Sequence, residues 1–188
     1  MYKYLILSVL VSIIIASCNM GQPAGANGIK YRSSLEYNNY IMERQKQVVE
    51  GMGSYTSASQ GDLTTASREL DKAVATITNG LKDIQGMSTY DGDSSLRDAA
   101  ANLFAFYKKS FTSDFREMLL ISKKVQENTG TPQDIERYKL IQQSISKTEG
   151  PLDEKMKEAQ VNFAKKYNLV LSDHSLQDKI DHMKTKTK

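Results

Sequence analysis

Apolar residues recur at three- and four-residue steps along most of the chain, which is the spacing of one face of an α-helix. The clearest stripe consists of Leu63, Ala66, Leu70, Val74, Ile77, Leu81 and Ile84. Similar stripes precede and follow it, and polar, glycine-containing turns separate them. The pattern predicts four amphipathic helices.

Capping signals mark where these helices begin. Ser33 stands three residues before Glu36, which is the spacing of a capping box, and Asp62 can cap the second helix. The first stripe contains Ile41, Val48, Val49, Met52 and Tyr55. The segment between Met87 and Ser94 is rich in turn residues, so the second helix ends before it.

The third helix is predicted to begin at Ser95 and to run without interruption to Gly130. Its stripe contains Leu96, Ala100, Leu103, Tyr107, Phe111, Phe115, Met118 and Val125. Thr131-Pro132-Gln133-Asp134 then supplies a cap, a first-turn proline and an acidic first turn for the fourth helix. The fourth stripe contains Ile135, Tyr138, Ile145, Leu152, Met156, Ala159 and Phe163.

Gly150-Pro151 lies inside the fourth stripe, and proline usually kinks or breaks a helix. Ile145 and Leu152 are seven residues apart, so the apolar face keeps its phase across the interruption. We therefore expect one kinked helix, followed by a return of residues 169–171 toward the core and a short helix over residues 175–184. Four such helices with short links predict an all-α, antiparallel up-down-up-down four-helix bundle over residues 33–188.

The N-terminus has a different pattern. Lys3 precedes an apolar run from Tyr4 to Ile15, and small residues follow the run. This is the order of a secretory signal peptide, and the run is shorter than the ~20 residues that a membrane-spanning helix needs. Ile15-Ala16-Ser17-Cys18 resembles the bacterial lipoprotein box.

That resemblance implies that the Cys18 thiol takes a diacylglyceryl group, that residues 1–17 are cleaved off, and that the freed amine takes a further chain such as palmitate. The alternative is a free or buried thiol; a disulfide within the chain is excluded because Cys18 is the only cysteine. Two or more acyl chains hold a protein stably to a membrane. We therefore expect a lipid-anchored protein of the bacterial cell envelope, on the outer membrane or cell surface in preference to the inner membrane.

Residues 18–32 are predicted to be the lipidated cysteine and a flexible tether. The segment contains Gly21, Pro23, Gly25 and Gly28 among small and polar residues, which can bury little apolar surface. In the predicted bundle, the turn from Met87 to Ser94 lies at the same end as this tether. The turns at Ser54–Asp62 and Asn128–Gln133 lie at the opposite end.

Residues with catalytic or metal-binding chemistry are sparse. The net charge of +3 gives no concentrated basic face for nucleic acid. The paired Glu-x-x-His motifs of di-iron bundles are missing, and His174 and His182 are interpreted as solvated surface residues. Asp91-Gly92-Asp93 starts like a calcium loop, but Arg97 and Asn102 occupy ligand positions, so a plain turn is expected.

Catalytic motifs are missing too. The sequence contains neither a nucleophile elbow nor a phosphate-binding glycine loop, and Asp153-Glu154 is expected on the outer face of the fourth helix. We therefore expect no catalytic, cofactor or metal residues, and a protein that is not an enzyme.

Residues Leu35-Glu36-Tyr37-Asn38-Asn39, together with Gln45, Val48 and Met52, are similar to a group of small helical surface lipoproteins of unknown function from Bacteroidetes and spirochaetes. The resemblance covers the first third of the chain and implies no catalytic residues. The leading hypothesis is a membrane-tethered module that binds an envelope or extracellular protein. The alternative is a carrier of an apolar small molecule in the bundle core, held by Tyr107, Phe111, Phe115 and Phe163.

Overall fold

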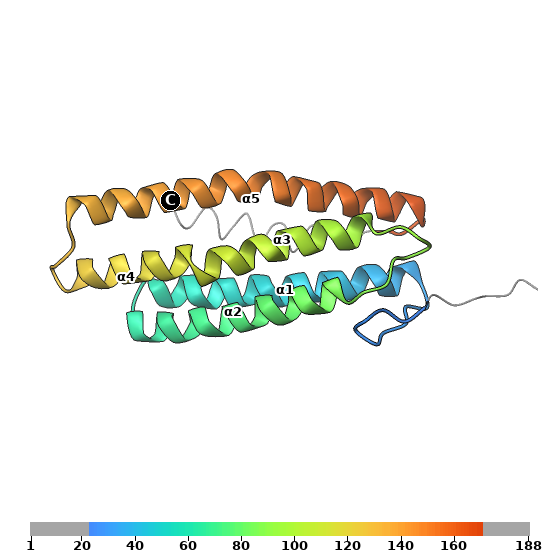
Figure 1. Cartoon of the computed structure of the whole chain (residues 1–188), viewed down its shortest axis with the longest axis horizontal. Helices are drawn as coiled ribbons and strands as arrows, with labels where there is room; N and C mark the ends of the chain where they lie inside the picture. Colours follow the sequence, from blue (N-terminus) through green and yellow to red (C-terminus); the bar gives the residue numbers. More distant parts are fainter. Residues whose placement is uncertain (1–22, 171–188) are drawn as a thin grey trace, which may run out of the picture.

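A computed structural model of the protein describes residues 23–170, and helices account for most of them. The five helices are α1 (Ser34–Ser59), α2 (Leu63–Gln85), α3 (Ser95–Thr112), α4 (Asp114–Gln126) and α5 (Pro132–Lys166). In Figure 1, α4 continues the direction of α3, and the resulting rods lie side by side with alternating directions. The prediction of an all-α helical bundle is confirmed.

The predicted capping residues begin three of the helices. The Ser33 hydroxyl accepts from the Glu36 amide at 3.1 Å, and the Asp62 carboxylate accepts from the amides of Thr64 and Thr65, both at 3.0 Å. Thr131 and Asp134 form a reciprocal capping box at the start of α5. Each cap satisfies amides that have no partner within the helix, so these signals fix the helix boundaries.

The third predicted helix is interrupted, contrary to expectation. Ser113 separates α3 from α4 and has φ −118° and ψ −66°. The hydroxyls of Thr112 and Ser113 donate to the carbonyls of Lys108 and Lys109, one turn earlier, at 2.6 and 2.8 Å. Back-bonding of this kind bends helices, and two such residues in succession explain the break.

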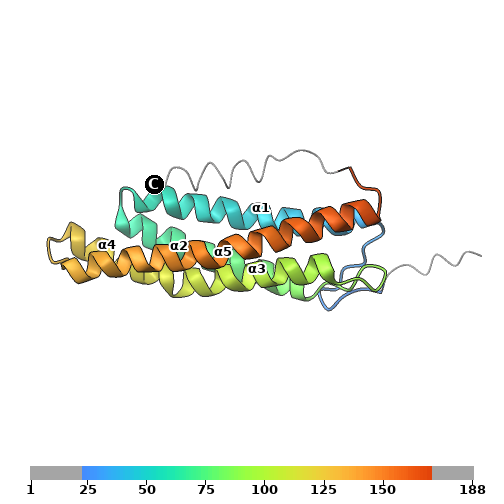
Figure 2. The ribbon, with the colours of Figure 1, turned by 90° about the horizontal axis from the view of Figure 1, so that it is seen from above.

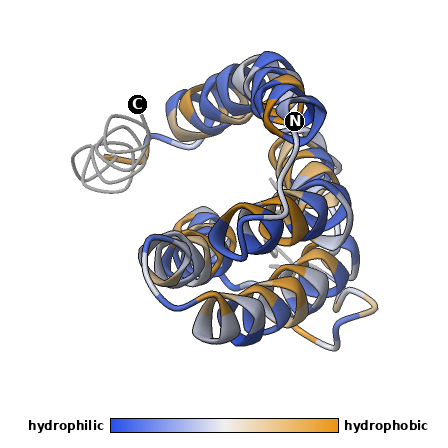
Figure 3. Ribbon diagram, turned by 90° about the vertical axis from the view of Figure 1, so that its left-hand side faces the viewer, coloured by the Kyte–Doolittle hydropathy of each residue, from blue (hydrophilic) through white to orange (hydrophobic). Residues whose placement is uncertain are grey.

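Apolar and polar positions alternate along every helix (Figure 3), and the apolar ones form one core. Ile41 on α1, Ile77 on α2, Leu103 on α3 and Phe163 on α5 all belong to it. Gly80 has no side chain where α2 meets α3, and a Cβ there would lie 2.7 Å from Phe104 Cε1. The missing side chain lets the Phe104 ring pack directly on α2.

The last turn of α4 and the first turns of α5 are much less buried than the predicted apolar stripes require. Val125 and Ile135 are 45% and 41% exposed, although both belong to predicted apolar faces. Figures 1 and 2 show the reason: the α4–α5 hairpin extends beyond the turn that joins α1 and α2. No described helix packs against the tip of this hairpin. α5 passes through Gly150-Pro151 as a single helix, as expected.

Residues 25–31 are part of the folded domain, which corrects the prediction of a flexible tether reaching Arg32. The Asn27 amide donates to the Gly86 carbonyl at 2.9 Å, and the Asn27 side chain donates to the Tyr31 hydroxyl at 2.9 Å. Tyr31 is only 2% exposed. Composition predicted a tether because the segment is rich in glycine, but a Cβ on Gly25 would lie 2.2 Å from the Gly86 carbonyl oxygen. At Gly25, glycine therefore permits close packing.

We call the end of the bundle where residue 23 lies the entry end, and the opposite end the far end. At the entry end, the Tyr37 hydroxyl donates to the Ser88 carbonyl and Lys166 pairs with Asp93 at 2.7 Å. The far end carries the α1–α2 and α4–α5 turns (Figure 1), which is the distribution of turns expected from the sequence. Leu169 packs against the core as expected, whereas Val170 is exposed. Residues 1–17, Cys18 and the predicted helix over 175–184 lie outside the described residues.

Candidate functional site

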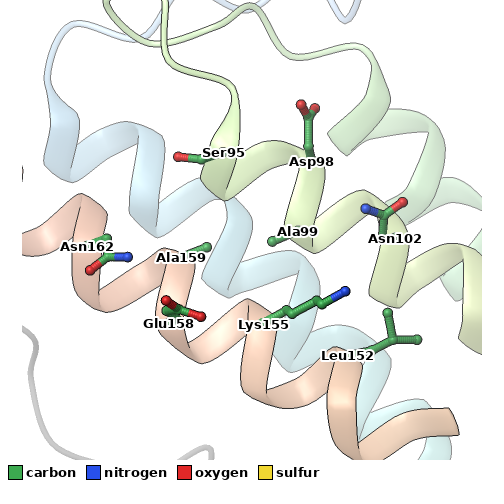
Figure 4. Close-up of a pocket in the computed structure, with 9 residues that line it drawn as sticks. All are labelled: Ser95, Asp98, Ala99, Asn102, Leu152, Lys155, Glu158, Ala159 and Asn162. Atoms are coloured by element: carbon green, nitrogen blue, oxygen red, sulfur yellow. The ribbon is translucent and has the colours of Figure 1, made fainter.

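An open groove of about 380 Å³ lies between α3 and α5 (Figure 4). Its floor is made by Ala99, Leu152 and Ala159. The two alanines face each other from neighbouring helices, and their short side chains leave the space that a larger pair would fill. The polar residues around it are Ser95, Asp98, Asn102, Lys155, Glu158 and Asn162.

Several polar groups of the groove are engaged with the protein itself. The Ser95 hydroxyl donates to the Asp93 carboxylate at 2.6 Å. Asp98 accepts from the Ser94 hydroxyl at 2.6 Å and from Arg97 at 2.9 Å. In Figure 4 the Lys155 side chain extends along the groove toward Asn102. An apolar floor with amide and charged groups at its edge suits one side chain of a partner or a small amphipathic ligand.

A second polar cluster lies on the same two helices, more than one helical turn closer to the far end. The buried Tyr107 hydroxyl is 3.1 Å from Glu149 Oε1 and 3.4 Å from Asp153 Oδ1, so two carboxylates on either side of Pro151 share one hydroxyl donor. Asp153 therefore faces α3, and the expectation that Asp153-Glu154 lies wholly on the outer face is wrong for Asp153. Burial, reinforced by the negative charges of Glu149 and Asp153, raises the pKa of Tyr107 well above its ordinary value of 10.0.

This raised pKa predicts a loss of stability in alkali. The folded state keeps the Tyr107 proton, whereas the unfolded chain releases it near the ordinary pKa of 10.0. The stabilisation is therefore complete below that pH and is lost as the pH rises from there toward the folded pKa. Thermal melting followed by circular dichroism should show a falling Tm. Tyr107→Phe should lose less Tm over the same pH interval; an equal loss in both proteins would contradict this role.

The four aromatic residues expected to hold an apolar ligand do not surround one cavity. Phe111 and Phe115 pack on each other with centroids 4.2 Å apart, and Tyr55 contacts both rings. Phe163 belongs to a different cluster, where it stacks on Tyr37 at 5.5 Å. None of the four lines the groove between α3 and α5. Their ring contacts make them parts of the packed core.

The Phe163 cluster is a continuous set of rings at the entry end. Its members are Tyr31, Tyr37, Tyr40, Tyr90, Phe163 and Tyr167. Burial raises the pKa of Tyr31 to about 12, and it raises the pKa of Tyr37 further. Arg44 lies over the Tyr40 ring at 4.1 Å and pairs with Asp83 at 2.9 Å. The periodicity did not reveal this cluster, because Tyr31, Tyr90 and Tyr167 lie outside the helices.

Few of the residues that the sequence analysis considered for lipidation or metal binding lie in the described part of the chain. Cys18, His174 and His182 lie outside the described residues. Asp91-Gly92-Asp93 forms a tight turn, with φ of 49° at Asp91 and 76° at Gly92, closed by hydrogen bonds between Tyr90 and Asp93. Within residues 23–170, no three His, Cys, Asp or Glu side chains gather closely enough to hold a metal ion.

In comparisons with known proteins, no protein-family model, curated protein or solved structure matches the chain. Across the part of the chain that the structure describes, none of the helices combines the length and apolar character needed to span a bilayer.

Proposed function

We propose that this protein is a lipid-anchored protein of the bacterial cell envelope whose helical domain binds a protein or another envelope component without catalysing a reaction. The observation that carries the binding role is the contrast between a core filled by aromatic side chains and an open groove on the side of the bundle. An apolar ligand carried inside the bundle would need the space that Phe111, Phe115 and Phe163 occupy with ring contacts.

The groove offers a partner three kinds of contact. Ala99, Leu152 and Ala159 can cover an apolar side chain, Asn102 and Asn162 can exchange hydrogen bonds, and Lys155 and Glu158 supply charges of opposite sign. Its volume of about 380 Å³ is at the lower end of the ~300–1,000 Å³ range of ligand pockets, so one inserted side chain fits it better than a large cofactor.

Site-specific photo-crosslinking tests the groove. A benzophenone amino acid at Asn162, on the rim, should give an adduct when the protein is irradiated in bacterial envelopes. The same amino acid at Asn79, an exposed asparagine on α2, should give none. Filling the groove with Ala159→Phe should remove the Asn162 adduct while the circular dichroism spectrum is kept. Adducts of equal yield at Asn162 and Asn79 would argue against a groove-directed partner.

The anchor is tested by metabolic labelling with a fatty acid. Cys18→Ala should abolish the label and leave an unprocessed precursor or a product cut elsewhere, because the modification needs the thiol. Ser17→Ala is the matched control, since it keeps a small residue before the cysteine and should keep the label. Label that persists in Cys18→Ala would overturn the proposed anchor.

A further inference from the structure

Residues 25–31 are docked on the bundle, and this docked segment brings the folded domain close to the proposed anchor at Cys18. Gly25 stands seven residues after Cys18, and a chain extends at most ~3.6 Å per residue, so the connection covers at most about 25 Å. A connection reaching Ser33, as the sequence predicted, could cover about 54 Å. α5 alone, with 35 residues, is about 52 Å long. With Cys18 in the membrane, the distance from the membrane to the entry end is therefore limited to less than the length of the bundle.

The two ends of the bundle differ in composition. The far-end turns, residues 57–62 and 127–133, contain no aromatic residue, no lysine and no arginine. The entry end carries the half-buried rings of Tyr40, Tyr90 and Tyr167. Tyrosine is enriched where one end of a side chain meets apolar groups and the other meets water, as at a membrane interface.

Exposed apolar side chains lie at both ends, with Val125 and Ile135 at the far end; at the entry end, Val170 is 91% exposed and Leu35 is 50% exposed. Lys30, Arg32 and Lys165 are exposed cations there, whereas Lys166 pairs with Asp93. Asp98 is a further exposed carboxylate at this end, and it pairs with Arg97 at 2.8 Å. Lys30, Arg32 and Lys165 outnumber the other two exposed carboxylates, Glu36 and Asp91. Apolar, tyrosine and cationic side chains together match the chemistry of an anionic bilayer surface.

We infer that the entry end is a second membrane contact: it rests against anionic lipid headgroups, with Leu35 and Val170 toward the acyl chains and Lys30, Arg32 and Lys165 toward the phosphates. This inference rests on the proposed lipidation of Cys18. It assigns the docked Gly25–Tyr31 segment a positioning role, because that segment sets the distance between anchor and bundle. The bundle then stands on the membrane with its far end directed away.

Tryptophan fluorescence tests this orientation, because the chain contains no tryptophan and one introduced residue is a unique reporter. Val170→Trp places the reporter at the entry end and Thr129→Trp places it at the far end. The lipidated chain is reconstituted in vesicles of phosphatidylcholine and phosphatidylglycerol that carry brominated acyl chains. We expect emission to be lost at position 170 and kept at position 129. Both variants have the same tryptophan, so its own preference for interfaces is matched.

The charges are tested in the Val170→Trp protein by replacing Lys30, Arg32 and Lys165 with glutamine. Emission should return on anionic vesicles, because each cation near such a surface contributes to the attraction. If these three substitutions left the quenching unchanged, the proposed headgroup contact would be refuted. Equal quenching at positions 129 and 170 would overturn the proposed orientation.

A parallel sample separates this inference from the anchor itself. The chain beginning at Cys18 is coupled through its thiol to a maleimide-bearing lipid, so the geometry is tested whether or not cells lipidate the residue. Entry-end quenching in the coupled protein without lipid on the cellular protein would refute the anchor. Lipid on the cellular protein without entry-end quenching in either sample would refute the contact.

Discussion

Ile77→Asp should unfold the domain, whereas Lys82→Asp should leave its stability nearly unchanged. Ile77 is 0% exposed in the middle of α2, and Lys82 lies one and a half turns later on the exposed face. A buried carboxylate without a partner costs several kcal/mol, against a total stability of ~5–15 kcal/mol for a domain. An exposed substitution usually changes stability by less than ~0.5 kcal/mol.

Thermal and urea denaturation of the two variants measure this difference. Ile77→Asp should show no cooperative transition, and Lys82→Asp should melt like the parent. Because both changes introduce the same residue into the same helix, helix propensity does not distinguish them. Equal melting temperatures would show that the buried face of α2 is assigned wrongly.

Tyr31→Ala should destabilise the domain by about 3–5 kcal/mol, as large-to-small changes of buried aromatic residues do. The Tyr31 ring contacts Tyr37 at 5.1 Å and Tyr40 at 5.4 Å, and its hydroxyl accepts from Asn27. Tyr31→Phe keeps the ring and loses only that hydrogen bond, so it should cost about 1 kcal/mol.

Lys30→Ala is the matched control, because Lys30 is exposed in the same segment. It should change the free energy of unfolding by less than ~0.5 kcal/mol. Urea denaturation of the three variants gives the order directly. If Tyr31→Ala and Lys30→Ala were equally stable, Gly25–Tyr31 would not be docked in solution.

Local signals predicted most of the helical fold. Ser33, Asp62 and the Thr131–Asp134 pair each act on amides within the next turn, so their effect can be read without knowledge of the rest of the fold. The α2 stripe likewise identified Ile77 and Ile84 as core, because a face that repeats every three or four residues has only one side to bury.

The errors concern contacts between distant segments. Tyr31 is buried because Asn27 meets Gly86 across the bundle end, and no periodicity within residues 19–32 encodes that meeting. Ile135 continues a valid apolar face but extends past the helices that could cover it. The groove arises where Ala99 on α3 meets Ala159 on α5. Alanine is common in helices, so neither residue indicates a groove when its own helix is considered alone.

The proline inside α5 divides that helix into parts of different resistance to local opening. Pro151 has no amide proton to donate to the preceding turn, so the chain of backbone hydrogen bonds is interrupted there. Before it, Ile141 is the only fully buried residue; after it, Met156, Phe163 and Ala164 are buried. We therefore expect amide protons of residues 133–150 to exchange with solvent through openings that leave residues 152–166 closed, so that hydrogen exchange divides α5 into two units of cooperative unfolding.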